Sequence, residues 1–130
     1  METINTIKIY LVDDDVFCLN MYKQHLDNMN YKNVTCFESG AVCLENLNEQ
    51  PDVIFLDHDM DSITGLEVLK KIKQFNPNIF VVLLSGKASL KTAVNALKFG
   101  AFDYIVKGLY EFENISKVLG NIVKLKQPVK

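Results

Sequence analysis

The segment 51–61, PDVIFLDHDMD, sets the strongest limit on the possible folds. Residues 53–56 form an unbroken apolar run that is too short for a helix, so it predicts a strand buried on both faces. Such a strand lies inside a sheet that is covered on both sides. Asp57, Asp59 and Asp61 then follow within one turn. Two carboxylates about 4 Å apart repel by roughly 4 kcal/mol at an effective dielectric of about 20, so this turn is either a solvated polar loop or a cation site.

The rest of the chain alternates short apolar runs with segments of helical periodicity. Strands are predicted at 7–12, 34–37, 53–56, 79–84 and 104–106. A helix is predicted after each strand; the starts lie at Asp14 or Asp15, Ser39, Gly65, Ser89 and shortly before Phe112, and Gly100 is expected as a left-handed helix end. Because parallel strands need right-handed crossovers that cover the sheet, the predicted fold class is α/β. The expected architecture is one domain over 1–130 with a doubly wound, five-stranded parallel sheet and helices on both faces.

Helical spacing also predicts which helix residues face the core. They are Cys18, Met21, Tyr22, Leu26, Met29, Val42, Cys43, Leu44, Leu47, Leu66, Leu69, Ile72, Phe75, Phe112, Ile115, Leu119, Ile122 and Val123. His25 lies near the first stripe and has no second His or Cys at ligand spacing, so we interpret it as a packing residue.

Composition argues against several classes of partner. With 14 lysines, no arginine and a formal net charge of −2, the chain has no basic field for nucleic acid. Cys18, Cys36 and Cys43 lack metal-ligand spacing and are expected to be reduced thiols. No apolar run approaches the ~20 residues of a membrane span, and no leader-like segment opens the sequence. The expectation is a soluble, cytoplasmic protein without membrane contact.

Polar groups follow four of the predicted strands, at the edge where such sheets bind ligands. They are Asp13 and Asp14 after the first strand, Asp57 after the third, Ser85 after the fourth and Lys107 after the fifth. This set fits phosphoryl transfer to a carboxylate. The three aspartates offer the oxygen ligands that Mg²⁺ prefers. Ser85 offers a hydrogen bond to a phosphoryl group, and Lys107 offers a point charge.

Four motifs resemble those of the receiver domains of two-component response regulators: LVDDD, PDVIFLDHDM, VVLLSGKA and ALKFGAFDYIVK. The resemblance covers essentially the whole chain, is close to chemotaxis regulators, and implies the strand order 2-1-3-4-5. It implies that Asp57 is the phosphorylated residue and that Asp13, Asp14 and Asp57 hold Mg²⁺ with the backbone carbonyl of Asp59. It further implies that Ser85 and Lys107 contact the phosphoryl group and that Tyr104 is the switching aromatic.

The same resemblance implies a signalling role and no enzyme activity beyond the domain's own phosphoryl transfer and dephosphorylation. The implied upstream partner is a histidine kinase or a histidine phosphotransfer protein. The implied output is a downstream protein target, or an output domain that is expected to be absent from this chain.

Two positions depart from the family pattern, because Asp61 and Gly108 stand where proline is usual. A cis bond to a non-proline residue costs roughly 2.5–4 kcal/mol, against about 0.5–1 kcal/mol before proline. The Lys107–Gly108 bond is therefore predicted to be trans or mobile, with Lys107 less pre-organised than in the family. Asp59 and Lys87 flank the site and either form an ion pair across its mouth or remain two solvated charges.

Three other classes fit less well. A calcium-binding EF-hand loop starting at Asp57 would need Gly and Glu at the positions of Ser62 and Val68. The main alternative is a haloacid-dehalogenase-type aspartyl-phosphate phosphohydrolase, whose first Asp usually follows an early strand and whose cap domain has little room here. A flavodoxin-like cofactor binder needs a first loop rich in glycine and hydroxyls, whereas this loop is triply acidic.

Overall fold

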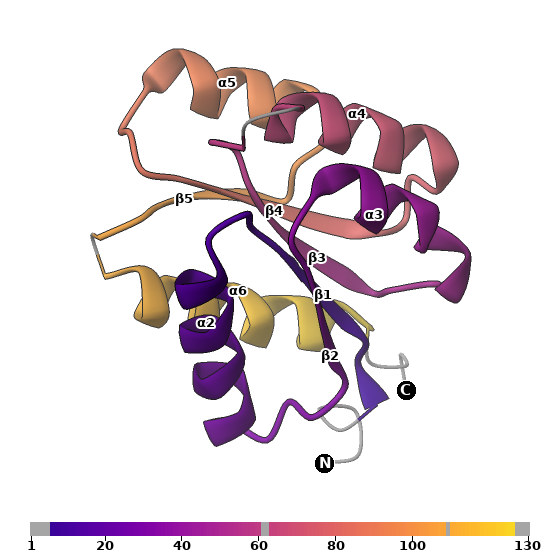
Figure 1. The fold of residues 1–130 in the computed structure, drawn as a ribbon, viewed down its shortest axis with the longest axis vertical. Helices are drawn as coiled ribbons and strands as arrows, with labels where there is room; N and C mark the ends of the chain where they lie inside the picture. The colour runs from indigo at the N-terminus through magenta and orange to yellow at the C-terminus, as the bar shows by residue number, and fades with distance from the viewer. Residues whose placement is uncertain (1–5, 61–62, 109, 127–130) are drawn as a thin grey trace.

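The computed structural model describes residues 6–60, 63–108 and 110–126. Within them the chain forms β1 (Ile9–Val12), α2 (Val16–Asn28), β2 (Val34–Phe37), α3 (Gly40–Glu45), η1 (Leu47–Glu49), β3 (Val53–Asp57), α4 (Gly65–Phe75), β4 (Phe80–Ser85), α5 (Leu90–Lys98), β5 (Asp103–Val106) and α6 (Glu111–Lys126) (Figure 1). The strands make a parallel sheet in the order β2-β1-β3-β4-β5. The predicted fold class and strand order are confirmed.

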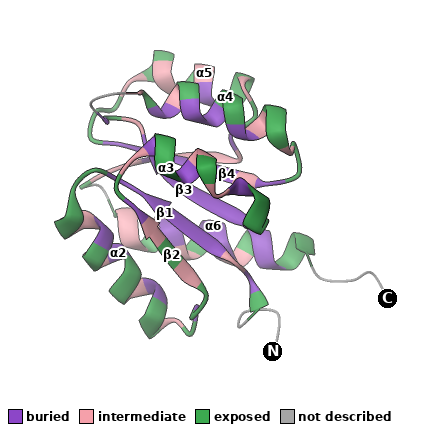
Figure 2. Cartoon of the chain, turned by 45° about the vertical axis from the view of Figure 1, so that its right-hand side comes forward, coloured by how far each residue is buried: buried purple, intermediate pink, exposed green. Residues whose placement is uncertain are grey.

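Helices cover both faces of the sheet. Helices α2 and α6 lie on one face, and α3, α4 and α5 lie on the other (Figure 1). Alternate residues of each strand enter the two cores; in β1, for example, Leu11 faces α2 and α6 whereas Tyr10 faces α3 and α4. Every residue of β3 is buried (Figure 2). The apolar run at 53–56 is thus the inner strand that its sequence predicts.

Side-chain oxygens satisfy the free amides at four helix starts. Asp15, Ser39, Thr64 and Ser89 accept hydrogen bonds from the first turns of α2, α3, α4 and α5, respectively. At the end of α5, Gly100 has a φ of +103°, which confirms the expected left-handed conformation.

Two residues expected in the core are exposed instead: Val42 by 45% and Phe75 by 56%. In α3, Cys43 points inward, and each residue of a helix is rotated by about 100° from the last, so Val42 points outward. Leu47 is buried as predicted but belongs to η1, because α3 has only six residues. Phe75 is the last residue of α4, at the edge of the stripe formed by Val68, Leu69 and Ile72.

The structure also places the cysteines and His25. The three cysteines are free thiols. His25 packs against Phe112 with ring centroids 5.1 Å apart, and its Nε2 lies 2.9 Å from the Ser116 hydroxyl. In the described part of the chain, no helix combines the length and the apolar character that crossing a membrane requires.

Candidate functional site

The carboxyl ends of β1, β3, β4 and β5 bring together the polar residues that the sequence predicts there. Asp13, Asp57 and Ser85 are each 3% exposed or less, and they are the buried polar or charged residues within the described part of the chain. Asp57 and Ser85 are the last residues of β3 and β4. The backbone of both residues is therefore held by the hydrogen-bond ladder of the sheet.

Lys107 joins two of the carboxylates. Its Nζ lies 2.8 Å from Asp13 Oδ2 and 3.0 Å from Asp57 Oδ1. Burial disfavours the ammonium form, but the attraction of the two carboxylates outweighs it and raises the pKa of Lys107 above its ordinary value. Lys107 is therefore a permanent positive charge in this site.

At Asp57 the effect of burial on the pKa outweighs the opposing attraction of Lys107. Burial raises the pKa of the Asp57 carboxyl, Lys107 opposes this effect, and the nearby Asp13 charge adds to the rise. Its buried Oδ1 forms an ion pair with the Lys107 ammonium at 3.0 Å and has no further partner among the described residues. Buried acceptors of this kind normally have a partner, so the atom has unused binding capacity.

The predicted metal ligands lie together. Asp13, Asp14 and Asp57 each offer a carboxylate oxygen, and these atoms lie within 4.8 Å of one another. Asp14 is exposed, so this cluster is open to solvent on one side. Three carboxyl groups face the one ammonium of Lys107, so this group of residues has an excess of acidic side chains. The donor set and the charge fit a divalent cation with oxygen ligands.

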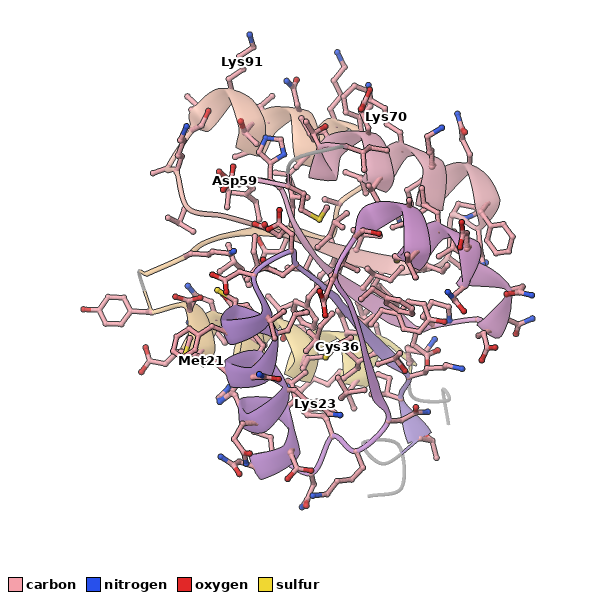
Figure 3. All side chains as sticks on the ribbon, in the orientation of Figure 1. Met21, Lys23, Cys36, Asp59, Lys70 and Lys91 are labelled. Atoms are coloured by element: carbon pink, nitrogen blue, oxygen red, sulfur yellow. The ribbon has the colours of Figure 1, made fainter. Side chains whose placement is uncertain are left out.

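The Asp59 side chain makes hydrogen bonds that the sequence did not predict. Its Oδ2 accepts hydrogen bonds from the Gly86 amide at 2.9 Å and from the Ser85 hydroxyl at 3.3 Å. Asp59 is labelled in Figure 3, at the end of β3 that faces the β4–α5 loop. No ion pair between Asp59 and Lys87 is present among the described residues, so the first of the two expectations for this pair is wrong. The Gly86 amide and the Ser85 hydroxyl satisfy Asp59 Oδ2 instead.

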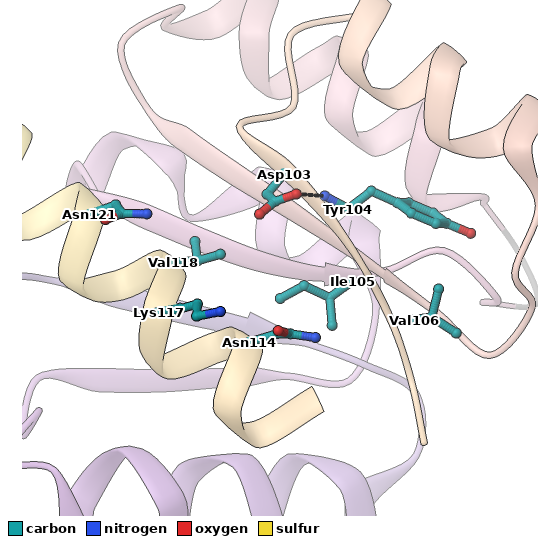
Figure 4. Close-up of a pocket in the computed structure, with 8 residues that line it drawn as sticks. All are labelled: Asp103, Tyr104, Ile105, Val106, Asn114, Lys117, Val118 and Asn121. Atoms are coloured by element: carbon teal, nitrogen blue, oxygen red, sulfur yellow. Dashed lines mark hydrogen bonds between the residues drawn. The ribbon is translucent and has the colours of Figure 1, made fainter. Parts of the chain in front are cut away.

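Tyr104 lies on β5 and points away from the groove of about 300 Å³ between β5 and α6 (Figure 4). Its hydroxyl donates a hydrogen bond to the backbone carbonyl of Lys87 at 2.7 Å. The ring is half-buried against the core formed with α3, α4 and α5. Tyr104 therefore contacts the β4–α5 loop two residues after Ser85.

The loop after Lys107 has contacts that the sequence did not predict. The described peptide bonds are all trans, which confirms the prediction for Lys107–Gly108. Gly108 has a φ of +79°, and its amide donates to Glu111 Oε1 at 2.6 Å. The other oxygen of Glu111 accepts a hydrogen bond from Tyr22. Lys107 reaches both carboxylates without the usual proline, and Asp61, the other departure, lies outside the described residues.

Comparisons with known proteins agree with this geometry. Residues 9–119 match the family described as the response regulator receiver domain. Over 118 residues the chain is 38% identical to the transcriptional regulatory protein ZraR of Escherichia coli K12, a match that covers 90% of this chain and 26% of ZraR. The chain thus spans about a quarter of that relative. Over 102 residues it is 32% identical to the chemotaxis protein CheY of Listeria monocytogenes, covering 78% of this chain and 86% of CheY.

Solved structures show the same likeness. A response regulator receiver domain protein from Clostridium thermocellum superposes with a TM-score of 0.83 at 28% identity, covering 92% of this chain and 96% of that one. A CheY-like receiver domain protein from Methanospirillum hungatei gives a TM-score of 0.79 at 27% identity, covering 92% and 96%. These comparisons give no support to the haloacid-dehalogenase-type alternative.

Proposed function

Because this chain belongs to the response regulator receiver domain family of two-component systems, we propose that Asp57 accepts a phosphoryl group from a histidine kinase or a histidine phosphotransfer protein. The observation that carries the proposal is the Asp57 carboxylate itself. It is buried at the carboxyl end of an inner strand, its Oδ1 lacks a hydrogen-bond partner among the described residues, and a lysine ammonium lies 3.0 Å away.

In the proposed step an Asp57 carboxylate oxygen attacks the phosphorus of a phosphohistidine. The new bond joins oxygen to phosphorus, the bond from nitrogen to phosphorus breaks, and the imidazole leaves with a proton from solvent. Lys107 stabilises the negative charge of the phosphoryl oxygens. The Ser85 hydroxyl, which now donates a long bond to Asp59, turns to donate to the phosphoryl group.

The residues of the site fit Mg²⁺. Asp13, Asp14 and Asp57 would hold it through their carboxylates, and Asp59 would hold it through its backbone carbonyl. When bound there, the ion supplies charge neutralisation for the phosphoryl oxygens. The protein itself contributes the three carboxylates, the buried Asp57 oxygen and the Lys107 ammonium beside it.

The signal would pass through Tyr104. When Ser85 turns toward the phosphoryl group, Tyr104 is free to leave the Lys87 carbonyl and turn inward, which shifts an existing equilibrium. The exposed surface of α5, β5 and α6 then changes, and this surface acts on a downstream protein or on an output domain. The domain has no substrate beyond its own phosphoryl group, and we place it in the cytoplasm, which suits its three free thiols.

The test is phosphorylation with acetyl phosphate and Mg²⁺, followed by intact mass. One phosphoryl group should be added to the wild-type chain and none to Asp57→Asn. Asp13, the other carboxylate beside Lys107, already accepts hydrogen bonds from the Asp15 amide and from the Lys107 ammonium. Asp14→Ala should still be labelled, but only at higher Mg²⁺ concentration. Full labelling of Asp57→Asn would show that the acceptor is a different residue.

A further inference from the structure

Glu111 connects the loop that carries Lys107 to helix α2. One carboxylate oxygen of Glu111 accepts the Gly108 amide at 2.6 Å, and the other accepts the hydroxyl of Tyr22. Tyr22 is 4% exposed, and its ring packs against Phe112 with centroids 5.7 Å apart. Glu111 thus links the buried Tyr22 side chain on α2 to the backbone amide of Gly108 in the loop after β5.

This link acts directly on the lysine of the site. The amide of Lys107 donates to the Ser85 carbonyl at 2.8 Å, and the next amide, that of Gly108, donates to Glu111. The backbone is therefore held immediately before and immediately after the Cα atom of Lys107. The direction in which this side chain leaves the backbone, toward Asp13 and Asp57, is set by these two bonds.

The identity of residue 108 makes the link possible. Proline has no amide hydrogen, so a proline at this position could not donate to Glu111. Glycine supplies the donor and also adopts the observed φ of +79° without the strain that a side chain would add. A carboxylate acceptor gives one of the stronger hydrogen bonds found in proteins.

We propose that Glu111, anchored by Tyr22, is a positioning residue for phosphoryl transfer, which holds the Lys107–Gly108 peptide so that the ammonium stays beside Asp57. The inference rests on the proposed function, because its effect is exerted on the phosphoryl acceptor. Glu111 acts through Lys107, and its contacts are with Gly108 and Tyr22.

The experiment measures the rate of phosphorylation of the full chain by acetyl phosphate in four variants. Glu111→Ala should slow the reaction roughly tenfold, since small displacements of a reacting group have effects of this size. Glu111→Gln keeps an oxygen acceptor for the Gly108 amide and should restore most of the rate. Tyr22→Phe keeps the ring packing and should slow the reaction about threefold. The matched control is Glu113→Ala, which removes an exposed carboxylate from the same first turn of α6 and should leave the rate unchanged.

A second arm tests whether Glu111 acts through the lysine. In a Lys107→Ala background, Glu111→Ala should cause no further slowing, because the group that it positions is gone. Hydrogen exchange of the Gly108 amide should also be faster in Glu111→Ala than in wild type. An equal rate factor with and without Lys107, or an equal effect of Glu113→Ala, would overturn the inference.

The outcomes separate this inference from the proposed function. If wild type and Glu113→Ala are phosphorylated normally and Glu111→Ala is too, the inference alone is wrong. If wild type takes up no phosphoryl group, the proposed function is wrong, and the positioning role is wrong with it. If Glu111→Ala does not fold, Tyr22→Phe still decides, because a normal phosphorylation rate for this variant would overturn the role of Tyr22 as the anchor of Glu111.

Discussion

Asp57 occupies a position where ionisation is unfavourable. Burial raises the pKa of its carboxyl above the ordinary value of 3.8, and Asp13 adds to this effect against the attraction of Lys107. A group whose pKa is higher in the folded state contributes stability that is fully present below its unfolded pKa. That stability is lost as the pH rises through the folded pKa. The ionised carboxylate that serves the proposed chemistry is therefore a cost to the fold at neutral pH.

Asp57→Asn should accordingly raise the free energy of unfolding at pH 7 by about 1 kcal/mol in the absence of divalent cations. The gain should shrink as the pH falls, because the folded carboxyl becomes protonated first and the unfolded carboxyl, with a pKa of 3.8, follows. Urea unfolding in a chelating buffer between pH 4 and pH 7 measures both effects.

Asp52→Asn is the contrasting variant, because the Asp52 carboxylate accepts the Lys8 amide at 2.8 Å and pairs with Lys126 at 3.0 Å. Loss of the Asp52 carboxylate should lower the free energy of unfolding. An Asp57→Asn variant less stable than wild type at pH 7 would contradict the account of Asp57 given above.

At the scale of the elements, the end of β3 and the start of α4 meet closely. The Gly65 amide donates to the His58 carbonyl at 3.2 Å, and Thr64 caps the helix through its side chain. A Cβ atom built on Gly65 would lie 2.7 Å from His58 Cα and 2.8 Å from the Asp57 carbonyl oxygen. The first turn of α4 can approach the acidic turn because this residue has no side chain.

Gly65→Ala should therefore destabilise the protein by about 2–3 kcal/mol, because the clashing atoms belong to backbone that cannot move without disturbing β3. It should also slow phosphorylation of Asp57, whose carbonyl is one of those atoms. Denaturant unfolding and acetyl phosphate labelling measure the two effects.

Gly120→Ala provides the matched control. Gly120 lies inside α6 with nothing within 4 Å of a built Cβ, so alanine should stabilise the helix by about 0.5–1 kcal/mol. Equal stability changes in the two variants would mean that the close approach at Gly65 has no energetic role.

At the scale of the whole molecule, the loop after β4 lies between the proposed phosphoryl site and the surface formed by α5, β5 and α6. Ser85 ends β4, and the loop after it is held by Asp59 on one side and by Tyr104 on the other. In the proposed switch, a change at Asp57 would reach β5 through these contacts of the loop after β4. The strands would hold the proposed reacting groups, and the loop would transmit the change.

Beryllofluoride with Mg²⁺, which imitates a phosphoryl group on a carboxylate, should shift amide NMR signals of α5, β5 and α6 as well as those around Asp57. The Tyr104 ring signals should move with them, because the bond to the Lys87 carbonyl is given up. Shifts confined to the Asp57 turn would refute the proposed switch. Asp57→Asn under the same conditions is the control and should show no shifts.

The sequence predicts the fold and the proposed site well because both depend on patterns in short segments. Apolar runs of strand length alternate with helical stripes, and parallel topology brings the ends of the strands together at one edge. The contact of Glu111 with Tyr22 spans 89 residues and follows no periodic pattern, so it could not be predicted. The Asp59 side chain was missed because its partner is a backbone amide, which every non-proline residue offers.

The hydroxyl of Tyr104 donates its hydrogen bond to a main-chain oxygen, so the acceptor persists when the side chain at position 87 changes. Every amino acid presents a carbonyl at position 87, so the contact of the Tyr104 hydroxyl does not depend on which side chain stands there. Substitutions at Lys87 can therefore alter the charge of this loop while the acceptor for Tyr104 is kept. The surface charge at this position and the proposed switch can change independently.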